Sequence, residues 1–282
     1  MTVEYLAGKR VKGLSTERLG SRTLSNIGIS TSGLKAYYNF EQTSGNLINQ
    51  AIVANGYTDG LGSSADGTPI NGVTQTISGK TNNAYDFDGT NDYVTLGNNF
   101  TSFQTGNISI SFWVKFDTAS GNGNMGIITK DFTSHSNPYR SVSISLAAGL
   151  LLWLNDGGSW TGSQITIISG SVPTDVWKHI VITRSGNTWT AYVDSVSVAT
   201  VVANPTFYST DWEIGRGRNL DYFNGKIDEV SFWSRALTTN EIQTLYSDGS
   251  LLTNIQNATV FEETDTNKSY IWNSSTSTWT QF

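Results

Sequence analysis

From Gly33 to about residue 249, short runs of alternating apolar and polar residues are separated by turns rich in Gly, Asn and Asp. The clearest run is Asn107–Phe116, in which every second residue is apolar: Ile108, Ile110, Phe112, Val114 and Phe116. Because side chains alternate between the two faces of a strand, this run predicts a strand with one buried face. About a dozen such runs predict an all-β protein, with two antiparallel sheets packed as a jelly-roll sandwich.

Further strands are predicted from the same alternation of apolar and polar residues. Residues 61–80, by contrast, are predicted to be a loop with weak strand signals. Two neighbouring runs, Trp177–Arg184 and Thr188–Val193, predict a hairpin across Ser185-Gly186-Asn187. We expect the tryptophans within or beside strands to be core residues: Trp113, Trp177, Trp189, Trp212 and Trp233. The remaining runs are Leu34–Phe40, Ala84–Phe87, Asp92–Leu96, Gly126–Lys130, Ser141–Leu146, Leu150–Leu154, Val196–Val201, Trp212–Ile214 and Lys226–Trp233.

One short helix is predicted near the end of this region. Thr238 is a good N-cap, and Glu241 three residues later completes a capping box. Gly249 is expected to end the helix. An apolar stripe would be formed by Ile242, Leu245 and Tyr246.

The two ends of the chain differ from the middle. Residues 1–32 carry five basic and two acidic residues and no strand pattern, which indicates a basic N-terminal arm. Residues 250–282 predict a small C-terminal β-hairpin, which needs to pack on something to be stable. The expected organisation is therefore an arm at 1–32, a sandwich domain at 33–249 and a hairpin segment at 250–282.

Composition and charge narrow the function classes. The net charge of −6 argues against nucleic acid or an anionic membrane surface as a partner. The absence of cysteine excludes disulfides and thiolate metal sites. No secretory signal is recognisable, and the longest apolar run, Leu146–Leu154, is too short to insert into a membrane.

Five motifs, in order, carry a family resemblance. They are Gly33–Glu41 (GLKAYYNFE), Ala84–Val94 (AYDFDGTNDYV), Ile108–Phe116 (ISISFWVKF), Val176–Arg184 (VWKHIVITR) with Ala191–Asp194 (AYVD), and Gly225–Val230 (GKIDEV) followed by Arg235–Leu237 and Glu241-Ile242. Together they resemble the laminin G-like, concanavalin A-like jelly-roll domains. One departure is Ser195, where the family usually has Gly, which predicts a different turn or mild strain.

The terminal segments resemble virion proteins of environmental phages and archaeal viruses. This looser resemblance implies a non-enzymatic structural protein at a virion surface or outside the cell, whose jelly roll binds glycans or decorates the particle. Its partners would be other virion subunits, with homo-oligomers expected, and a cell-surface glycan. The alternatives are a purely architectural capsid or tail component, and a glycan-active hydrolase.

We expect no catalytic residues. His179 lies within a strand, where the resemblance implies a structural histidine, and His135 lies in a polar loop. No strand carries an alternating acidic series of the Glu-x-Asp-x-x-Glu type, which a hydrolase of this class would need; the acids cluster at turns.

Two kinds of binding site remain as predictions. The resemblance implies a structural Ca²⁺ held by Glu41 and Asp228, with Asp88 and Asp92 as neighbours; the alternative is that these acids only bond to turn amides. For a glycan, exposed aromatic and polar loop residues are the expected contacts. The candidates are Trp160, Tyr139, Arg140, Asp156 and Tyr222.

Overall fold

The structure, a computed structural model, describes residues 10–13, 29–53, 57–100, 106–121, 124–131, 140–155, 163–217, 220–253, 260–273 and 278–282. The chain forms two compact units. The larger comprises Ser32–Thr238, and the smaller combines Met1–Thr31 with Thr239–Phe282.

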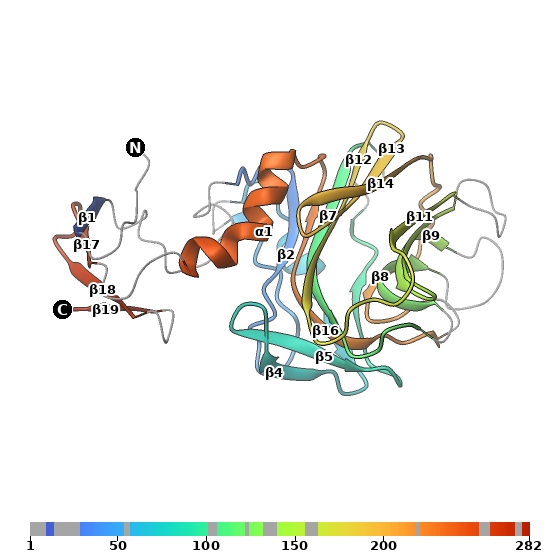
Figure 1. The fold of residues 1–282 in the computed structure, drawn as a ribbon, viewed down its shortest axis with the longest axis horizontal. Helices are drawn as coiled ribbons and strands as arrows, with labels where there is room; N and C mark the ends of the chain where they lie inside the picture. Colours follow the sequence, from blue (N-terminus) through green and yellow to red (C-terminus); the bar gives the residue numbers. More distant parts are fainter. Residues whose placement is uncertain are drawn as a thin grey trace. The chain divides into compact units, whose positions relative to one another are not determined.

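The larger unit is a sandwich of two antiparallel sheets, which confirms the predicted fold class (Figure 1). The seven-stranded sheet runs in the order β11 (Ser163–Ile168), β10 (Leu150–Leu154), β9 (Arg140–Leu146), β8 (Met125–Asp131), β15 (Trp212–Ile214), β6 (Tyr93–Gly97) and β3 (Thr68–Ile70). The eight-stranded sheet runs β14 (Val196–Val202), β13 (Thr188–Val193), β12 (Trp177–Ser185), β7 (Ile108–Phe116), β16 (Asn224–Trp233), β5 (Asn83–Asp88) and β4 (Thr74–Ser78), with β2 (Leu34–Tyr38) also on β16.

Strand β16 pairs with two different strands along the same edge, because a bulge interrupts it. Its first half, Asn224–Ile227, pairs with β5, and its second half pairs with β2. The register against β7 shifts between Asp228 and Ser231, and Glu229 has a positive φ of 53°. The bulge therefore changes which strand lies next to β16 without ending the sheet.

The core lies between the two sheets. All five alternate apolar residues of β7 are fully buried there, as predicted, and so are Trp189 and Trp212. Trp113 and Trp233 are also buried, but outside this cluster. Trp177 is the exception and is only half-buried. Each large side chain buried in this way contributes roughly 1.5–3 kcal/mol, so this double layer is the main source of stability.

Within the sandwich, the elements differ from expectation in two places. Residues 61–80 contain β3, β4 and one turn of 3-10 helix (η3, Gly62–Ala65), and β11 was not expected at all. The β11 residues SQITII follow a Gly/Ser-rich stretch, which hid the alternation of Ile165 and Ile167. These weak strands form because neighbouring strands supply hydrogen-bond partners that local propensity cannot.

The smaller unit contains a four-stranded sheet made from both ends of the chain. Strand β1 (Arg10–Gly13) pairs in parallel with β17 (Val260–Glu263), which continues into β18 (Ser269–Asn273) and β19 (Thr278–Gln281). The predicted hairpin corresponds to β18 and β19, whereas the pairing of β1 was not expected. Phe261 is fully buried.

Helix α1 (Thr239–Thr253) groups with this smaller unit and continues through Gly249, where the sequence analysis ended it. That prediction was wrong because an internal glycine costs only about 1 kcal/mol relative to alanine, which weakens a helix without stopping it. Among the described residues, no helix is both long and apolar enough to cross a bilayer.

The turn between β13 and β14 keeps the conformation that Asp-Gly would adopt. Asp194 and Ser195 have positive φ angles of 49° and 68°. Two left-handed central residues are the mark of a type I′ turn, so Ser195 has not changed the turn type. Of the two expected outcomes, the structure therefore shows mild strain: Ser195 holds a side chain in a left-handed conformation that glycine adopts more easily.

Candidate functional site on the outer face of the seven-stranded sheet

A row of mostly polar residues crosses the outer face of the seven-stranded sheet. Residues aligned by strand pairing point to the same face, and the alternate positions of these strands are mostly buried apolar residues of the core, with buried Lys130 of β8 as a charged exception. Each of the seven strands contributes one residue to the row. From β3 to β11 they are Thr68, Thr95, Glu213, Thr129, Ser143, Trp153 and Gln164.

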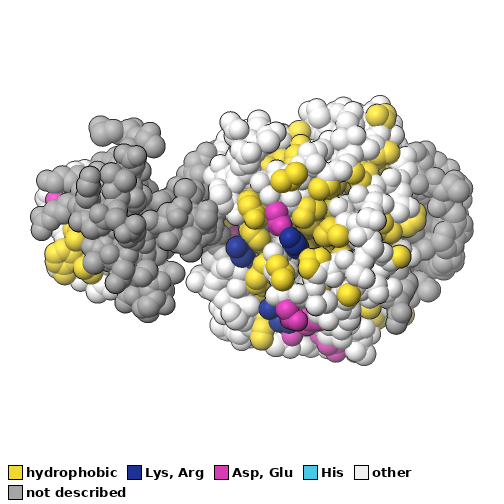
Figure 2. Space-filling model, viewed as in Figure 1, with side chains coloured by type: hydrophobic (Ala, Val, Ile, Leu, Met, Phe, Trp, Pro, Cys, Tyr) yellow, Lys and Arg dark blue, Asp and Glu magenta, His cyan; other side chains and the backbone are white. Residues whose placement is uncertain are grey.

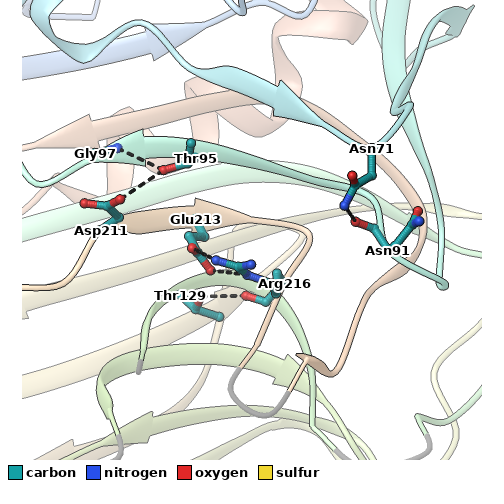
Figure 3. Close-up of polar contacts among 8 residues, drawn as sticks. All are labelled: Asn71, Asn91, Thr95, Gly97, Thr129, Asp211, Glu213 and Arg216. Carbon is teal, nitrogen blue, oxygen red and sulfur yellow. Dashed lines mark hydrogen bonds and ion pairs between the residues drawn. The ribbon is translucent and has the colours of Figure 1, made fainter. Parts of the chain in front are cut away.

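The charged centre of this row is an ion pair between Glu213 and Arg216. The guanidinium donates from Nε to Glu213 Oε2 at 2.8 Å and from Nη2 to Oε1, so it holds both carboxylate oxygens (Figure 3). The side chains are 9% and 12% exposed, respectively. Such two-point contact fixes the orientation of both groups.

Burial and charge shift both groups of the pair. Burial raises the pKa of Glu213; the hydrogen bonds and charge of Arg216 oppose this rise, and Asp211 adds to it. Burial by itself would lower the pKa of Arg216, but the bonds and charge of Glu213 raise it above the usual range. Arg216 therefore stays charged, and it is the local cation that stabilises the Glu213 carboxylate.

Aromatic rings flank the ion pair. The Arg216 guanidinium carbon lies 3.7 Å from the centre of the Tyr93 ring, and Tyr93 lies 6.4 Å from Tyr222, centre to centre. Both tyrosines are half-exposed. Asp211 is exposed on the same face and accepts a hydrogen bond from Thr95 Oγ1 at 3.3 Å (Figure 3).

A glycine pair brings the loop after β15 onto this face. A Cβ on Gly126 would lie 2.3 Å from the backbone nitrogen of Gly217, so the two backbones meet at a distance that no other residue permits. The loop is further fixed by Gly126 N donating to Asp221 O at 3.1 Å and by Thr129 Oγ1 donating to Arg216 O at 2.7 Å. This close approach sets the position of Arg216.

Two acidic residues on this face bear on whether it could hydrolyse a glycan or only bind one. Asp211 and Glu213 are two residues apart at β15 and lie on one face, which is the spacing at which a carboxylate pair could act on a glycosidic bond. Burial raises the pKa of Glu213, as a general acid needs, but both of its oxygens are engaged by Arg216. Polar side chains, half-exposed aromatic rings and a fixed arginine are the groups that hold a sugar.

Of the predicted ligand residues, the structure places Tyr222 at this site. Arg140 is the first residue of β9, with Asp131 of β8 as its pairing partner. The other three, Tyr139, Asp156 and Trp160, lie outside the described residues. Tyr222 was a candidate in the sequence, whereas Glu213, Arg216 and Tyr93 were not singled out.

Sequence reasoning missed these three residues for a recognisable reason. The triplet Asp211-Trp212-Glu213 alternates polar and apolar residues, which puts both acids on one face once Trp212 enters the core. The signal was short, because β15 itself has only three residues, Trp212–Ile214, and Asp211 precedes it. The contact of Tyr93 with Arg216 joins residues more than a hundred positions apart, and no local pattern announces it.

The four predicted calcium ligands fall in two places, at opposite ends of β5. At one end, Asn83 Nδ2 donates to Glu41 Oε2 at 3.0 Å, and Thr81 N donates to Asp228 Oδ2 at 2.9 Å. At the other, Asp88 accepts from the amide of Thr90 at 2.7 Å within its own turn.

Asp92 also lies at this second end of β5. It is almost fully buried, and burial, followed by the charge of Asp88, raises its pKa. The described part of the chain contains no cluster of three or more acidic or histidine side chains suited to a metal. Calcium therefore stays a prediction for these residues.

His179 is a structural residue, as the sequence predicted. It is buried, its Nε2 lies 2.9 Å from Ser111 Oγ, and its ring lies 4.9 Å from that of Trp113. Burial lowers the pKa of His179 to about 3, so the imidazole is neutral near pH 7. His135 lies outside the described residues.

Solved structures with the same fold include proteins of different activities. The fourth domain of an extracellular arabinanase from Geobacillus stearothermophilus, solved with arabinotriose, has a TM-score of 0.57 and 19% identity, over 76% of this chain and 98% of that domain. A Trypanosoma rangeli sialidase with sialic acid gives 0.57 and 14%, and the binding domain of a botulinum neurotoxin with rat synaptotagmin II gives 0.56 and 15%. Each match covers 83% of this chain, but only 36% and 54% of those chains, respectively.

At these identities the structures establish the fold alone. No curated protein matches this sequence. A sequence model of the concanavalin A-like lectin/glucanases superfamily, of laminin G type, matches residues 88–243, which is more than half of the chain. The chain therefore belongs to the concanavalin A-like lectin/glucanase superfamily.

Proposed function

We propose that this protein is a non-enzymatic glycan-binding protein whose ligand lies on the outer face of the seven-stranded sheet. The observation that carries the proposal is the Arg216 guanidinium, held by Glu213 and stacked on Tyr93, with half-exposed Tyr222 and exposed Asp211 beside it. A site with fixed donors and acceptors binds without the cost of ordering them. The arabinotriose complex of the arabinanase domain supports sugar binding by this fold.

The fixed charges favour a neutral saccharide. Among the described residues around Arg216, the carboxylates are Asp211, Glu213 and Asp221, and Arg216 is already neutralised by Glu213. Lys130, which interacts with Asp211, offsets one of these charges. The remaining balance is negative, so an acidic sugar would lose binding free energy at this face. Neutral hydroxyls can donate to the carboxylates and stack their apolar faces on the tyrosines.

A glycan array followed by calorimetry tests the proposal, with neutral and sialylated glycans as separate arms. We expect neutral glycans to bind and Tyr222→Ala to weaken binding at least tenfold. Tyr192→Ala is the matched control, because Tyr192 lies on β13 of the other sheet. An array without hits for folded protein, or equal losses in the two variants, would contradict the proposal.

The hydrolase alternative rests on Asp211 and Glu213 sharing one face. Release of reducing ends from the glycans that bind would support it, provided that Glu213→Gln abolishes the release while binding persists. We expect no release, because Arg216 occupies both oxygens of Glu213.

The proposed setting is the surface of a virion or another extracellular structure. Support comes from the smaller unit, in which β1 and β17 join the two ends of the chain in one sheet. A separate unit built from both ends is suited to anchoring, whether to a particle or to sister subunits. Removing residues 1–32 is expected to abolish attachment or assembly and to leave the sandwich folded. An architectural role without a ligand is the outcome if glycans fail to bind.

A further inference from the structure

Lys130 of β8 is a buried lysine whose amine contacts a side-chain amide. Among the lysines whose side chains the structure describes, only Lys130 is buried, with 0% of the residue exposed. By contrast, Lys226 is partly exposed on the other sheet, 3.1 Å from Asp86 and 3.0 Å from Asp117. Figure 2 shows basic side chains next to acidic ones on one face of the sandwich unit. Lysines in such surface pairs keep their charge, whereas burial at Lys130 disfavours the charged form of the amine.

The amine of Lys130 lies against the side-chain amide of Asn98. Lys130 Nζ donates to Asn98 Oδ1 at 2.7 Å and to the backbone oxygen of Thr210. Because Cγ is bonded directly to Oδ1, the carbonyl carbon of Asn98 lies within about 4 Å of Nζ. Asn98 Nδ2 donates to Ser209 Oγ at 2.9 Å, which fixes the plane of the amide. A nucleophile and a carbonyl carbon held this close are positioned to react.

The surroundings of Lys130 leave part of its amine uncharged. Burial lowers the pKa of Lys130 from 10.5 to about 8, and the charge of Asp211 opposes this fall. Roughly a tenth of the amine is therefore neutral at pH 7, whereas the fraction is below about a thousandth for an ordinary lysine. The ring of buried Trp212 lies 5.8 Å from Nζ, centre to nitrogen, and shields the amine from water on that side. A neutral, shielded amine is the reactive form of lysine.

We infer that Lys130 and Asn98 become joined by an intramolecular isopeptide bond. The neutral amine attacks Cγ of Asn98, so that a bond forms between Nζ and Cγ. The bond between Cγ and Nδ2 breaks, and Nδ2 leaves as ammonia. One of the two amine protons stays on the new amide and the other goes to the leaving nitrogen. Asp211 is the carboxylate whose charge reaches Lys130, and we assign it this proton transfer.

The bond would span the strand that carries Glu213. Strand β15 lies between β6 and β8; Asn98 directly follows β6, and Lys130 is on β8. The link would close a loop over 32 positions and hold both neighbours of the three-residue strand β15 together. A disulfide stabilises a fold in the same way, but this chain has no cysteine. Because the reaction needs no glycan, the inference does not depend on the proposed function.

The first test is the intact mass of the unfolded full chain, measured by mass spectrometry. We expect the natural chain to be lighter than its sequence by one ammonia. Lys130→Arg and Asn98→Ala should each have the full mass of their sequence, because one reacting group is gone. Lys226→Arg is the matched control and should keep the loss, since Lys226 contacts carboxylates and not an amide. A natural chain with the full sequence mass would overturn the inference.

The second test locates the bond by digestion with trypsin, which does not cut after a lysine whose amine is bonded. The natural chain should give one branched peptide in which residues 81–115 are joined to residues 116–140. This result does not depend on the folding of any variant. Loss of ammonia without the branched peptide would indicate ring closure at an Asn-Gly pair and would also overturn the inference.

The role of Asp211 has its own comparison. Asp211→Ala should leave the two segments unlinked, because the proton transfer is lost. Asp117→Ala, which removes an exposed acid on the other sheet, should give the branched peptide in the same yield as the natural chain. Equal yields from the two variants would overturn the part assigned to Asp211.

Discussion

Removing Arg216 is expected to leave a buried charge without its cation. In the folded protein the Glu213 side chain is only 9% exposed, and both of its oxygens bond to Arg216. Breaking a buried ion pair by removing one partner costs 3–5 kcal/mol, and the slight exposure here places the expected loss at the lower end, about 3 kcal/mol at pH 7. For a unit of this size that corresponds to a fall in Tm of about 6–12 °C.

The loss should depend on pH in a defined direction. Without Arg216, burial and Asp211 remain, and both raise the pKa of Glu213 in the folded state. Below the unfolded-state pKa of about 4.3 the carboxyl is protonated in both states, so the penalty is absent there. It develops as pH rises above the unfolded-state pKa and is complete above the raised folded-state pKa.

Thermal unfolding followed by circular dichroism at pH 7 and pH 4 measures both effects. Arg216→Ala should lose far more stability at pH 7 than at pH 4, relative to the natural chain at each pH. The double variant with Glu213→Gln should recover much of the loss, because the unpaired charge is gone. An equal loss at both pH values, or no recovery in the double variant, would refute the reasoning.

Three further predictions concern the turn, the loop and the buried histidine. Ser195→Gly should stabilise the protein by about 1 kcal/mol, because glycine adopts positive φ without strain, whereas Ser197→Gly in β14 should destabilise it; chemical denaturation measures both. Gly126→Ala forces a Cβ against the backbone of Gly217, so calorimetry should show glycan binding lost at Arg216 even where the sandwich remains folded. His179 has a folded-state pKa of about 3, below its unfolded value, so its contribution to stability is complete above about pH 6.5 and is lost as pH falls toward 3. His179→Gln should flatten this decline in unfolding midpoint between pH 6.5 and 4, and an unchanged slope would contradict the role.

Much of the sandwich could be predicted from the sequence, because strand alternation is a local property. The residues of β7 that alternate in the chain are the ones buried between the sheets, and the β12–β13 hairpin follows from its turn. The predicted end of the helix was wrong because one internal glycine lowers helix stability by only about 1 kcal/mol relative to alanine. Helix α1 therefore continues through Gly249. The weak strands β3, β4 and β11 form from their neighbours and not from their own composition.

The sequence by itself determined the two-sheet fold and the packed position of His179 within a strand, and it offered Tyr222 only as a candidate. Only the tertiary structure decided that Glu213 and Arg216 form a buried pair against Tyr93, and that β1 joins β17. The physical reason is the distance along the chain over which each interaction acts. Alternation and turns act between residues a few positions apart, whereas the candidate face is assembled by strand order and by one close backbone contact, Gly126 against Gly217. Those contacts exist only after the sheets have paired.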